Sequence, residues 1–107
     1  MRRVIIESPY AGDTALNMRY LRACIRDCLN KGEAPFASHG LYTSALDDNV
    51  PEERRLGIDA GREWNRVCHR VVVYRDLGIS PGMVEGVKWA YDQGIPVEYR
   101  NVEGWVK

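Results

Sequence analysis

The feature that most constrains the fold is an unbroken apolar run at residues 71–74, Val-Val-Val-Tyr. Strands with one wet face alternate apolar and polar residues. A strand that is apolar throughout is typical of the centre of a parallel sheet, where helices cover both faces. Val4, Ile5 and Ile6 form a second run of this kind near the start of the chain. We therefore expect these two segments to be adjacent central strands of a parallel sheet.

Helical stretches separate the predicted strands. Leu21, Cys24 and Cys28 recur at helical spacing, with Asp13 or Thr14 able to cap the start of that helix and Gly32 able to end it. Pro51 suits the first turn of a second helix. A third helix begins at Pro81 and ends at Gly94. The predicted inner faces are Leu56, Ala60, Trp64 and Val67 in the second helix, and Met83, Val87, Ala90 and Tyr91 in the third.

Two weaker strand signals complete the pattern, at residues 34–38 and 95–99. Strands and helices then alternate along the chain. Helical crossovers imply parallel strands with right-handed connections. We expect a small doubly wound α/β fold, Rossmann-like or flavodoxin-like, with about four strands in the order 2-1-3-4 and helices on both faces. Residues 1–107 would form one domain.

The charge balance narrows the class of partner. The 107 residues include 15 Lys and Arg and 15 Asp and Glu, so the formal net charge is zero. Proteins that bind nucleic-acid polymers usually carry a basic excess, and we expect no such partner. No apolar run has the length of a membrane span, and the first residues resemble a strand more than a signal peptide. We expect a cytoplasmic protein without a membrane partner, either bacterial or, if encoded by a phage, in its host.

The three cysteines predict neither disulfides nor a metal site. Cys24 and Cys28 lie four residues apart within a helical pattern, Cys68 follows another helix, and no Cys-x-x-Cys pair occurs. Such cysteines are commonly buried thiols that pack as small apolar side chains. A metal site using His39 or His69 is the less favoured alternative. We expect no bound metal and no cofactor, and we interpret His69, directly before the third strand, as structural.

The ligand site of a doubly wound fold lies where the strand order reverses, at the carboxyl ends of the strands. Three loops should meet there, the second being a long polar loop over residues 39–50. The candidate ligand-binding residues are Ser8, Pro9 and Tyr10 from the first loop, Ser38, His39 and Tyr42 from the second, and Asp76, Ser80, Gly82 and Met83 from the third.

The third loop predicts an anion site. Ser80 is a good helix N-cap, Pro81 a good first helical residue, and Gly82 leaves the backbone accessible. We expect Ser80, Gly82 and Met83 to present backbone N–H groups, with the Ser80 hydroxyl, to a phosphate or similar acidic group. Asp76 would face a ribose hydroxyl. The alternative is that the same residues only cap the helix.

Several motifs resemble the nucleoside 2-deoxyribosyltransferase superfamily, especially its short phage and bacterial members. They are Ser8-Pro9-Tyr10, Trp64 with Cys68, Asp76-x-Gly78-x-Ser80-x-Gly82-Met83, and Ala90-x-x-x-Gly94-x-Pro96-Val97. The resemblance implies a doubly wound fold, an oligomer, and a glutamate on the last helix that attacks the anomeric carbon of a deoxynucleoside. That nucleophile position falls on Gly86, with Glu85 one residue earlier, and many relatives carry aspartate where this chain has His69.

Two functions follow from this reading. The favoured one is a binder of a nucleotide or nucleotide-derived small molecule, for example a phage protein that sequesters a signalling nucleotide. The alternative is a nucleoside or nucleotide N-glycosidase or 2-deoxyribosyltransferase that uses Glu85. One residue on a helix is a rotation of about 100°, so the offset of Glu85 favours binding. The aromatic residues Trp89, Tyr99 and Trp105 predict a homodimer or a larger homo-oligomer.

Overall fold

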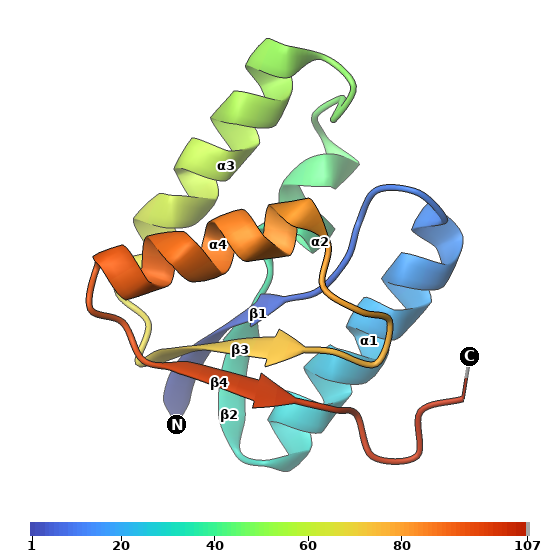
Figure 1. Ribbon diagram of the computed structural model, residues 1–107, viewed down its shortest axis with the longest axis vertical. Helices are drawn as coiled ribbons and strands as arrows, with labels where there is room; N and C mark the ends of the chain where they lie inside the picture. Colours follow the sequence, from blue (N-terminus) through green and yellow to red (C-terminus); the bar gives the residue numbers. More distant parts are fainter. Residues whose placement is uncertain (107) are drawn as a thin grey trace.

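The computed structural model describes residues 1–106 and shows one parallel sheet of four strands (Figure 1). The strands are β1 (Arg2–Glu7), β2 (Glu33–Phe36), β3 (Arg70–Tyr74) and β4 (Val97–Arg100). Their order is β2-β1-β3-β4, and every pairing is parallel. The two β-branched runs lie side by side, with Ile5 opposite Val71. The predicted fold class and strand order are confirmed.

Helices cover the two faces of the sheet. α1 (Thr14–Asn30) lies on one face and α4 (Pro81–Asp92) on the other (Figure 1). Because side chains alternate along a strand, each central strand contributes to both layers. Val4, Ile6, Val72 and Tyr74 pack with α1, whereas Ile5, Val71 and Val73 pack with Met83, Val87 and Ala90 of α4. Tyr91, expected on the inner face of α4, is instead exposed.

The predicted helix boundaries hold. Asp13 caps α1 by accepting a hydrogen bond from the Leu16 backbone N–H at 3.1 Å. Pro51 is the first residue of α3 (Pro51–Asn65). Gly32 and Gly94 follow α1 and α4 with φ of 75° and 70°. Glycine adopts these left-handed angles without a steric cost, and it therefore ends helices well.

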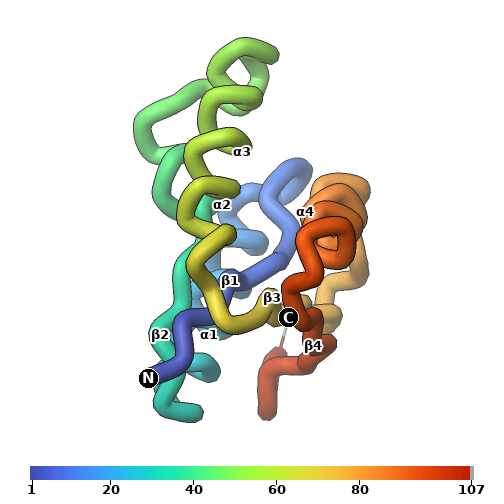
Figure 2. Tube along the Cα trace, turned by 90° about the vertical axis from the view of Figure 1, so that its left-hand side faces the viewer, coloured from blue at the N-terminus to red at the C-terminus, as the bar shows by residue number. Residues whose placement is uncertain are grey.

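The orientation predicted for α3 is wrong. Leu56, Trp64 and Val67 were expected to face the core, yet each is more than half exposed. Gly57, Gly61 and Asn65 face inwards instead. A Cβ at Gly61 would lie 2.6 Å from the Cβ of Ser38, so the absent side chain allows α3 to approach α2 (Ser38–Leu41) closely. Figure 2 shows α2 and α3 rising together above the sheet rather than lying across it.

Part of the predicted loop at residues 39–50 is helical. It contains most of α2 and the 3₁₀ turn η1 (Tyr42–Ser44), so irregular chain is confined to residues 45–50. The hydroxyl of Thr43 donates a 2.6 Å hydrogen bond to the carbonyl of His39. Polar composition suggested a loop here, but short helical turns form from the same residue types when side chains bond locally to the backbone.

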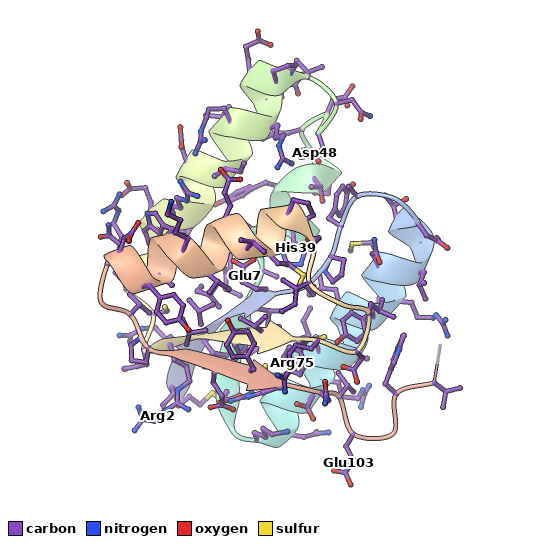
Figure 3. All side chains as sticks on the ribbon, in the orientation of Figure 1. Arg2, Glu7, His39, Asp48, Arg75 and Glu103 are labelled. Atoms are coloured by element: carbon purple, nitrogen blue, oxygen red, sulfur yellow. The ribbon has the colours of Figure 1, made fainter. Side chains whose placement is uncertain are left out.

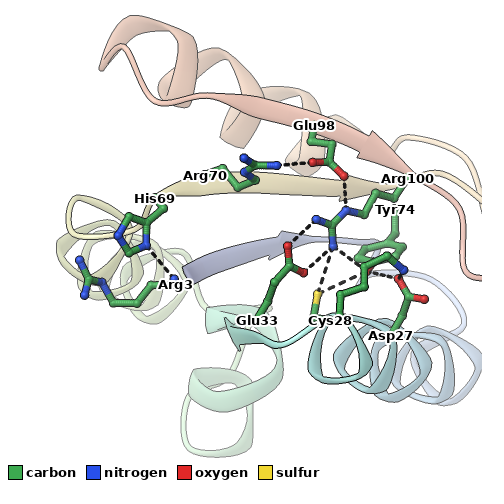
Figure 4. Close-up of polar contacts among 10 residues, drawn as sticks. Arg3, Asp27, Cys28, Glu33, His69, Arg70, Tyr74, Glu98 and Arg100 are labelled. Carbon is green, nitrogen blue, oxygen red and sulfur yellow. Dashed lines mark hydrogen bonds and ion pairs between the residues drawn. The ribbon is translucent and has the colours of Figure 1, made fainter. Parts of the chain in front are cut away.

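A buried polar network joins β4 to α1 and β2 (Figure 4). Arg100 and Glu33 are each 8% exposed, and two guanidinium nitrogens of Arg100 donate to the Glu33 carboxylate at 2.7 and 2.6 Å. Arg100 also donates to Glu98. Tyr74 donates to Asp27 at 2.6 Å. The hydrogen bonds from Arg100 lower the pKa of Glu33, and the same bonds raise the pKa of Arg100. Each charge in this network is therefore partnered.

Candidate functional site

A cleft of about 390 Å³ opens at the carboxyl end of β1. Its walls come from the segment after β1, from α2 and the residues that follow it, from α3, and from the first half of α4. Small-molecule sites commonly occupy clefts of this size. The location is the one predicted from the reversal of strand order between β1 and β3.

Most of the predicted site residues meet in this cleft. Nine of them line it: Ser8, Tyr10, Ser38, His39, Tyr42, Ser80, Gly82, Met83 and Glu85. Pro9 does not line it, although both of its neighbours do. Glu85 is exposed. The three loops predicted to converge therefore do converge, while their roles in ligand binding stay predictions.

Asp76 lies outside the cleft and serves the fold. Its carboxylate accepts a 2.5 Å hydrogen bond from the buried hydroxyl of Tyr20 and a 2.9 Å bond from the Val102 backbone N–H. These bonds tie the end of β3 to α1 and to the segment after β4. The expectation that Asp76 faces a ribose hydroxyl is wrong, because both bonds hold the side chain on the α1 side of the sheet.

The first turn of α4 is capped more completely than expected. Ser80 accepts a 3.3 Å hydrogen bond from the Met83 backbone N–H, and the Ser80 N–H donates to the Met83 sulfur at 3.4 Å. Met83 is 1% exposed. The Met83 N–H is thus already partnered, which corrects the prediction that it is available to an anion. Gly82 is exposed, and a Cβ there would meet only the Ser80 hydroxyl, at 4.0 Å.

Ser8 and His39 form a polar pair on the cleft wall. The Ser8 Oγ and the His39 Nε2 lie 2.7 Å apart. Ser8 is buried at the end of β1, and His39 belongs to α2. Burial lowers the pKa of His39 to about 4. The imidazole is therefore neutral at pH 7, and its contact with Ser8 holds the ends of β1 and β2 together beside the cleft.

Glu7 is a cleft residue that the sequence analysis did not predict (Figure 3). It is the last residue of β1, and alternation places it on the same face as Ile5, towards α4. Within residues 1–106 no side chain forms a hydrogen bond or ion pair with its carboxyl group. Burial raises the pKa of Glu7 to about 8, against a smaller lowering by Arg62. A glutamate directly after a run of buried β-branched residues was the available signal.

Gly86 makes room for the Glu7 carboxyl group. A Cβ at position 86 would lie 2.7 Å from the Glu7 Cδ and 2.9 Å from its Oε1. Such distances are well inside van der Waals contact. The carboxyl group therefore lies directly against the backbone of α4, at the position where the resemblance places a helix glutamate in related enzymes.

Asn65 and Arg62 complete the α3 wall. The Oδ1 of Asn65 is buried without a hydrogen-bond partner in the described chain, and Asn65 lines the cleft. The Arg62 guanidinium lies 5.7 Å from the centre of the Trp89 ring, which joins α3 to α4 across the cleft. Neither residue was predicted, because the apolar pattern of α3 pointed to its opposite face.

Tyr10, which lines the cleft, belongs to a segment that a buried amide holds in place. Asn17 Nδ2 donates to the backbone carbonyls of Tyr10 and Ala11 at 2.9 and 3.0 Å. Asn17 is 6% exposed. It therefore fixes the segment after β1, although sequence reasoning did not single it out.

The histidine and cysteine residues outside the cleft have structural surroundings. His69 Nδ1 accepts a 2.8 Å hydrogen bond from the Arg3 backbone N–H, at the opposite end of the sheet from the cleft. Cys24 and Cys28 are buried in the α1 layer. Across residues 1–106, no three side chains of His, Cys, Asp or Glu come together as metal ligands would. None of the helices in that range combines the length and apolar character needed to cross a membrane.

A comparison with known protein families assigns nearly the whole chain to one domain family. Residues 2–100 match the family described as "Domain of unknown function (DUF7768)". The chain belongs to that family. A comparison with curated proteins found no match.

A solved structure shares the fold of this DUF7768 member. It is a 2-deoxyribosyltransferase from the psychrotolerant bacterium Bacillus psychrosaccharolyticus. The TM-score is 0.65 at 14% sequence identity, over 98% of this chain and 76% of the other. The similarity extends to the whole sheet and its helices, which is what the motif resemblance implied for the fold.

Proposed function

We propose that the cleft at the carboxyl end of β1 binds a nucleoside or a nucleotide-derived small molecule. The observation that carries the proposal is the make-up of the cleft. Aromatic rings of Tyr10, Tyr42 and Trp89 line it together with Asn65 and with Glu7, whose carboxyl group has no hydrogen bond or ion pair with residues 1–106. Aromatic rings stack on bases of any sequence. Buried polar groups without protein partners are groups that a ligand can satisfy.

The fold supports the same ligand class. The solved structure that shares this fold is described as a biocatalyst for the synthesis of nucleosides. The motif resemblance to nucleoside 2-deoxyribosyltransferases points the same way. The accessible N-terminus of α4 adds room for a phosphate at Ser80 and Gly82, since helix N-termini favour anions. A 5′-phosphate on the ligand is therefore part of the proposal.

Binding is tested by thermal unfolding with nucleosides, nucleoside monophosphates, NAD and cyclic dinucleotides. A ligand present at about 100 times its Kd stabilises the native state by about 2.7 kcal/mol. Gly82→Leu should abolish that stabilisation while leaving the unliganded protein folded, because a side chain at Gly82 meets only the Ser80 hydroxyl. Lys88→Leu, on the exposed side of α4 and outside the cleft, is the matched control.

Two results would reject parts of this proposal. If no nucleoside or nucleotide shifts the unfolding temperature, the ligand class is wrong. If Gly82→Leu folds and binds a monophosphate as tightly as the parent chain, the phosphate position is wrong.

Catalysis by Glu85 is the alternative, favoured by the position of that side chain on the cleft wall. If Glu85 is catalytic, the protein should release free base from a nucleoside or its monophosphate. Chromatography of the reaction mixture would detect the base. Glu85→Gln would then lose turnover and keep binding. A pure binder releases no base either before or after that change.

We also propose that the protein is a homodimer joined through the outer face of α3. Leu56 and Trp64 are exposed on this face, and Val67, in the turn after the helix, is exposed as well. The flanking charges pair with opposite signs, Arg55 with Asp59 and Arg66 with Glu63, so a second copy meets no excess of like charge. Trp105, predicted as an interface residue, instead packs on Tyr20 with ring centres 4.9 Å apart. Light scattering that gives a monomer mass at micromolar concentration would reject the dimer.

A further inference from the structure

Arg62 differs from the other arginines on and directly after α3 because it has no carboxylate partner. The other three form ion pairs with a nearby acidic side chain: Arg54 with Asp48, Arg55 with Asp59, and Arg66 with Glu63. Within residues 1–106, the Arg62 guanidinium has neither a hydrogen bond nor an ion pair, although the side chain is half-buried and lines the cleft. Its N–H donors are therefore available to a ligand.

Trp89 holds the Arg62 guanidinium beside the cleft. The guanidinium carbon lies 5.7 Å from the centre of the Trp89 ring, within the range of a cation–π contact. Trp89 itself lines the cleft. Arg66 lies at the same distance from this ring, 5.7 Å, but does not line the cleft. An arginine that is already held against a ring loses less conformational freedom when it binds a ligand.

The side of α4 that faces the cleft connects Arg62 with the proposed phosphate position. Gly82, Gly86 and Trp89 all line the cleft, and residues three and four apart lie on one face of a helix. From Gly82 to Trp89 the helix rises about 10 Å. The cleft therefore has the N-terminus of α4 at one end of this face and the Arg62 guanidinium about two helical turns further along.

The acidic side chains of the cleft wall are not bonded to Arg62. Asp48 is paired with another arginine, and Glu53 accepts a hydrogen bond from a backbone N–H. Glu53 also precedes Arg62 by nine residues, which is about 13 Å along α3. Glu7 and Glu85 form no ion pair with Arg62 within residues 1–106. Because arginine stays protonated in proteins, the guanidinium has a full positive charge without a bonded counter-charge.

On the basis of the proposed function, we propose that Arg62 binds a second phosphate group, so that the cleft takes a nucleotide with phosphates on opposite sides of its sugar. A nucleoside 3′,5′-bisphosphate is such a ligand. Its 5′-phosphate lies at the N-terminus of α4, and the guanidinium donates two parallel hydrogen bonds to the 3′-phosphate. The two phosphates of a 5′-diphosphate share a bridging oxygen, so they lie too close together to reach both positions.

The first test is calorimetric titration of the full chain at about pH 7.5, where phosphate monoesters carry most of their second charge. The 5′-monophosphate, the 5′-diphosphate and the 3′,5′-bisphosphate are compared for the nucleoside whose monophosphate binds most tightly among adenosine, guanosine, cytidine and uridine. The bisphosphate should bind at least about tenfold more tightly than the other two, since hydrogen bonds to charged groups contribute this much. The diphosphate is the matched control, because it has the same number of phosphate groups.

The second test uses two arginines that lie equally far from the same ring. Arg62→Met removes the guanidinium and keeps an apolar side chain beside Trp89. It should weaken binding of the bisphosphate at least about tenfold and leave binding of the monophosphate within about threefold of the parent chain. Arg66→Met, outside the cleft, should bind both ligands as the parent chain does.

The outcomes separate this inference from the proposed function. If no nucleoside or nucleotide binds, the proposed function fails. If the monophosphate binds and the bisphosphate binds no more tightly than the diphosphate, the second phosphate position is wrong while the proposed function stands. If Arg62→Met and Arg66→Met weaken binding of the bisphosphate equally, the assignment to Arg62 is wrong. Because the comparison of ligands uses the unmodified chain, it gives an answer even if Arg62→Met does not fold.

Discussion

Two carboxyl groups of this molecule, one buried and one half-buried, have opposite surroundings. In the network on the α1 face, Glu33 is bound by two nitrogens of Arg100, and its pKa is lowered. In the cleft beside α4, Glu7 has no bonded partner in the described chain, and its pKa is raised to about 8. A buried carboxyl group with a cationic partner stays ionised, whereas burial without a partner favours its neutral form. The comparison separates a structural carboxyl group from one that is available to a ligand.

Breaking the paired site should have the largest effect on stability. Arg100→Met leaves Glu33 buried without a partner, which costs about 3–5 kcal/mol. Urea unfolding at pH 7 measures the loss. Arg55→Met removes an exposed, solvent-screened ion pair with Asp59 and should leave the stability almost unchanged. A loss from Arg100→Met as small as this control would show that the network is not important for stability.

Replacing Glu7, the carboxyl group without a partner, should raise the stability of the protein rather than lower it. Because the folded pKa of Glu7 lies above its ordinary value of 4.5, the native state holds a proton that the unfolded chain releases between those two pH values. The stability of the parent chain should therefore fall as pH rises from 4.5 to about 8. Glu7→Gln removes this loss.

The full shift would correspond to about 5 kcal/mol, and water reaching the part-exposed carboxyl group reduces the expected gain to about 2–3 kcal/mol. Glu7→Gln should thus be more stable than the parent at about pH 9 and equal to it at about pH 4. Chemical unfolding across this range gives the difference. A variant less stable than the parent at high pH would mean that Glu7 is a partnered carboxylate after all.

A smaller loss of stability is expected when the neutral hydroxyl group of Tyr20, on the α1 face of the sheet, is removed. Tyr20→Phe removes the hydroxyl that donates to Asp76 and accepts from its backbone N–H. Leaving these groups buried without the hydroxyl should cost about 1–3 kcal/mol in chemical unfolding. Tyr91→Phe, on an exposed ring, should change stability by less than about 0.5 kcal/mol. Equal effects of the two changes would argue against a structural role for Asp76.

The smallest effect on the isolated fold is expected on the outer face of α3. Leu56→Ser alters an exposed side chain and should change the stability of a monomer by less than about 0.5 kcal/mol. If α3 joins two copies, the same change should lower the mass measured by sedimentation. Leu29→Ser, equally exposed on α1, is the control. A dimer that survives Leu56→Ser would place the interface elsewhere.

The sheet was predictable because its signals are local. Uniform β-branched runs indicated β1 and β3. The N-caps Asp13 and Ser80 and the first-turn Pro51 indicated where helices begin. Alternating strands and helices then left few topologies. The segment at residues 39–50 was less predictable, since its α2 and η1 turns depend on side-chain bonds to the backbone.

The orientation of α3 and the contents of the cleft were not predictable in the same way. An apolar stripe on a helix indicates a buried face, but Leu56 and Trp64 are exposed because α3 packs through Gly57 and Gly61 instead. This packing of α3 places Asn65 and Arg62 on the cleft wall. Asp76 was misassigned because its partner, Tyr20, lies 56 residues away in the chain.

The close fit between Glu7 and Gly86 couples these two positions in this chain. A side chain at position 86 would force the Glu7 carboxyl group to move from its present place. Among relatives, we therefore expect glutamate at the first position to occur with glycine at the second, and larger residues on the helix to occur with small ones on the strand. A sequence comparison that treats positions 7 and 86 independently would miss this covariation. It would count the move of a carboxyl group from the strand to the helix as two unrelated substitutions.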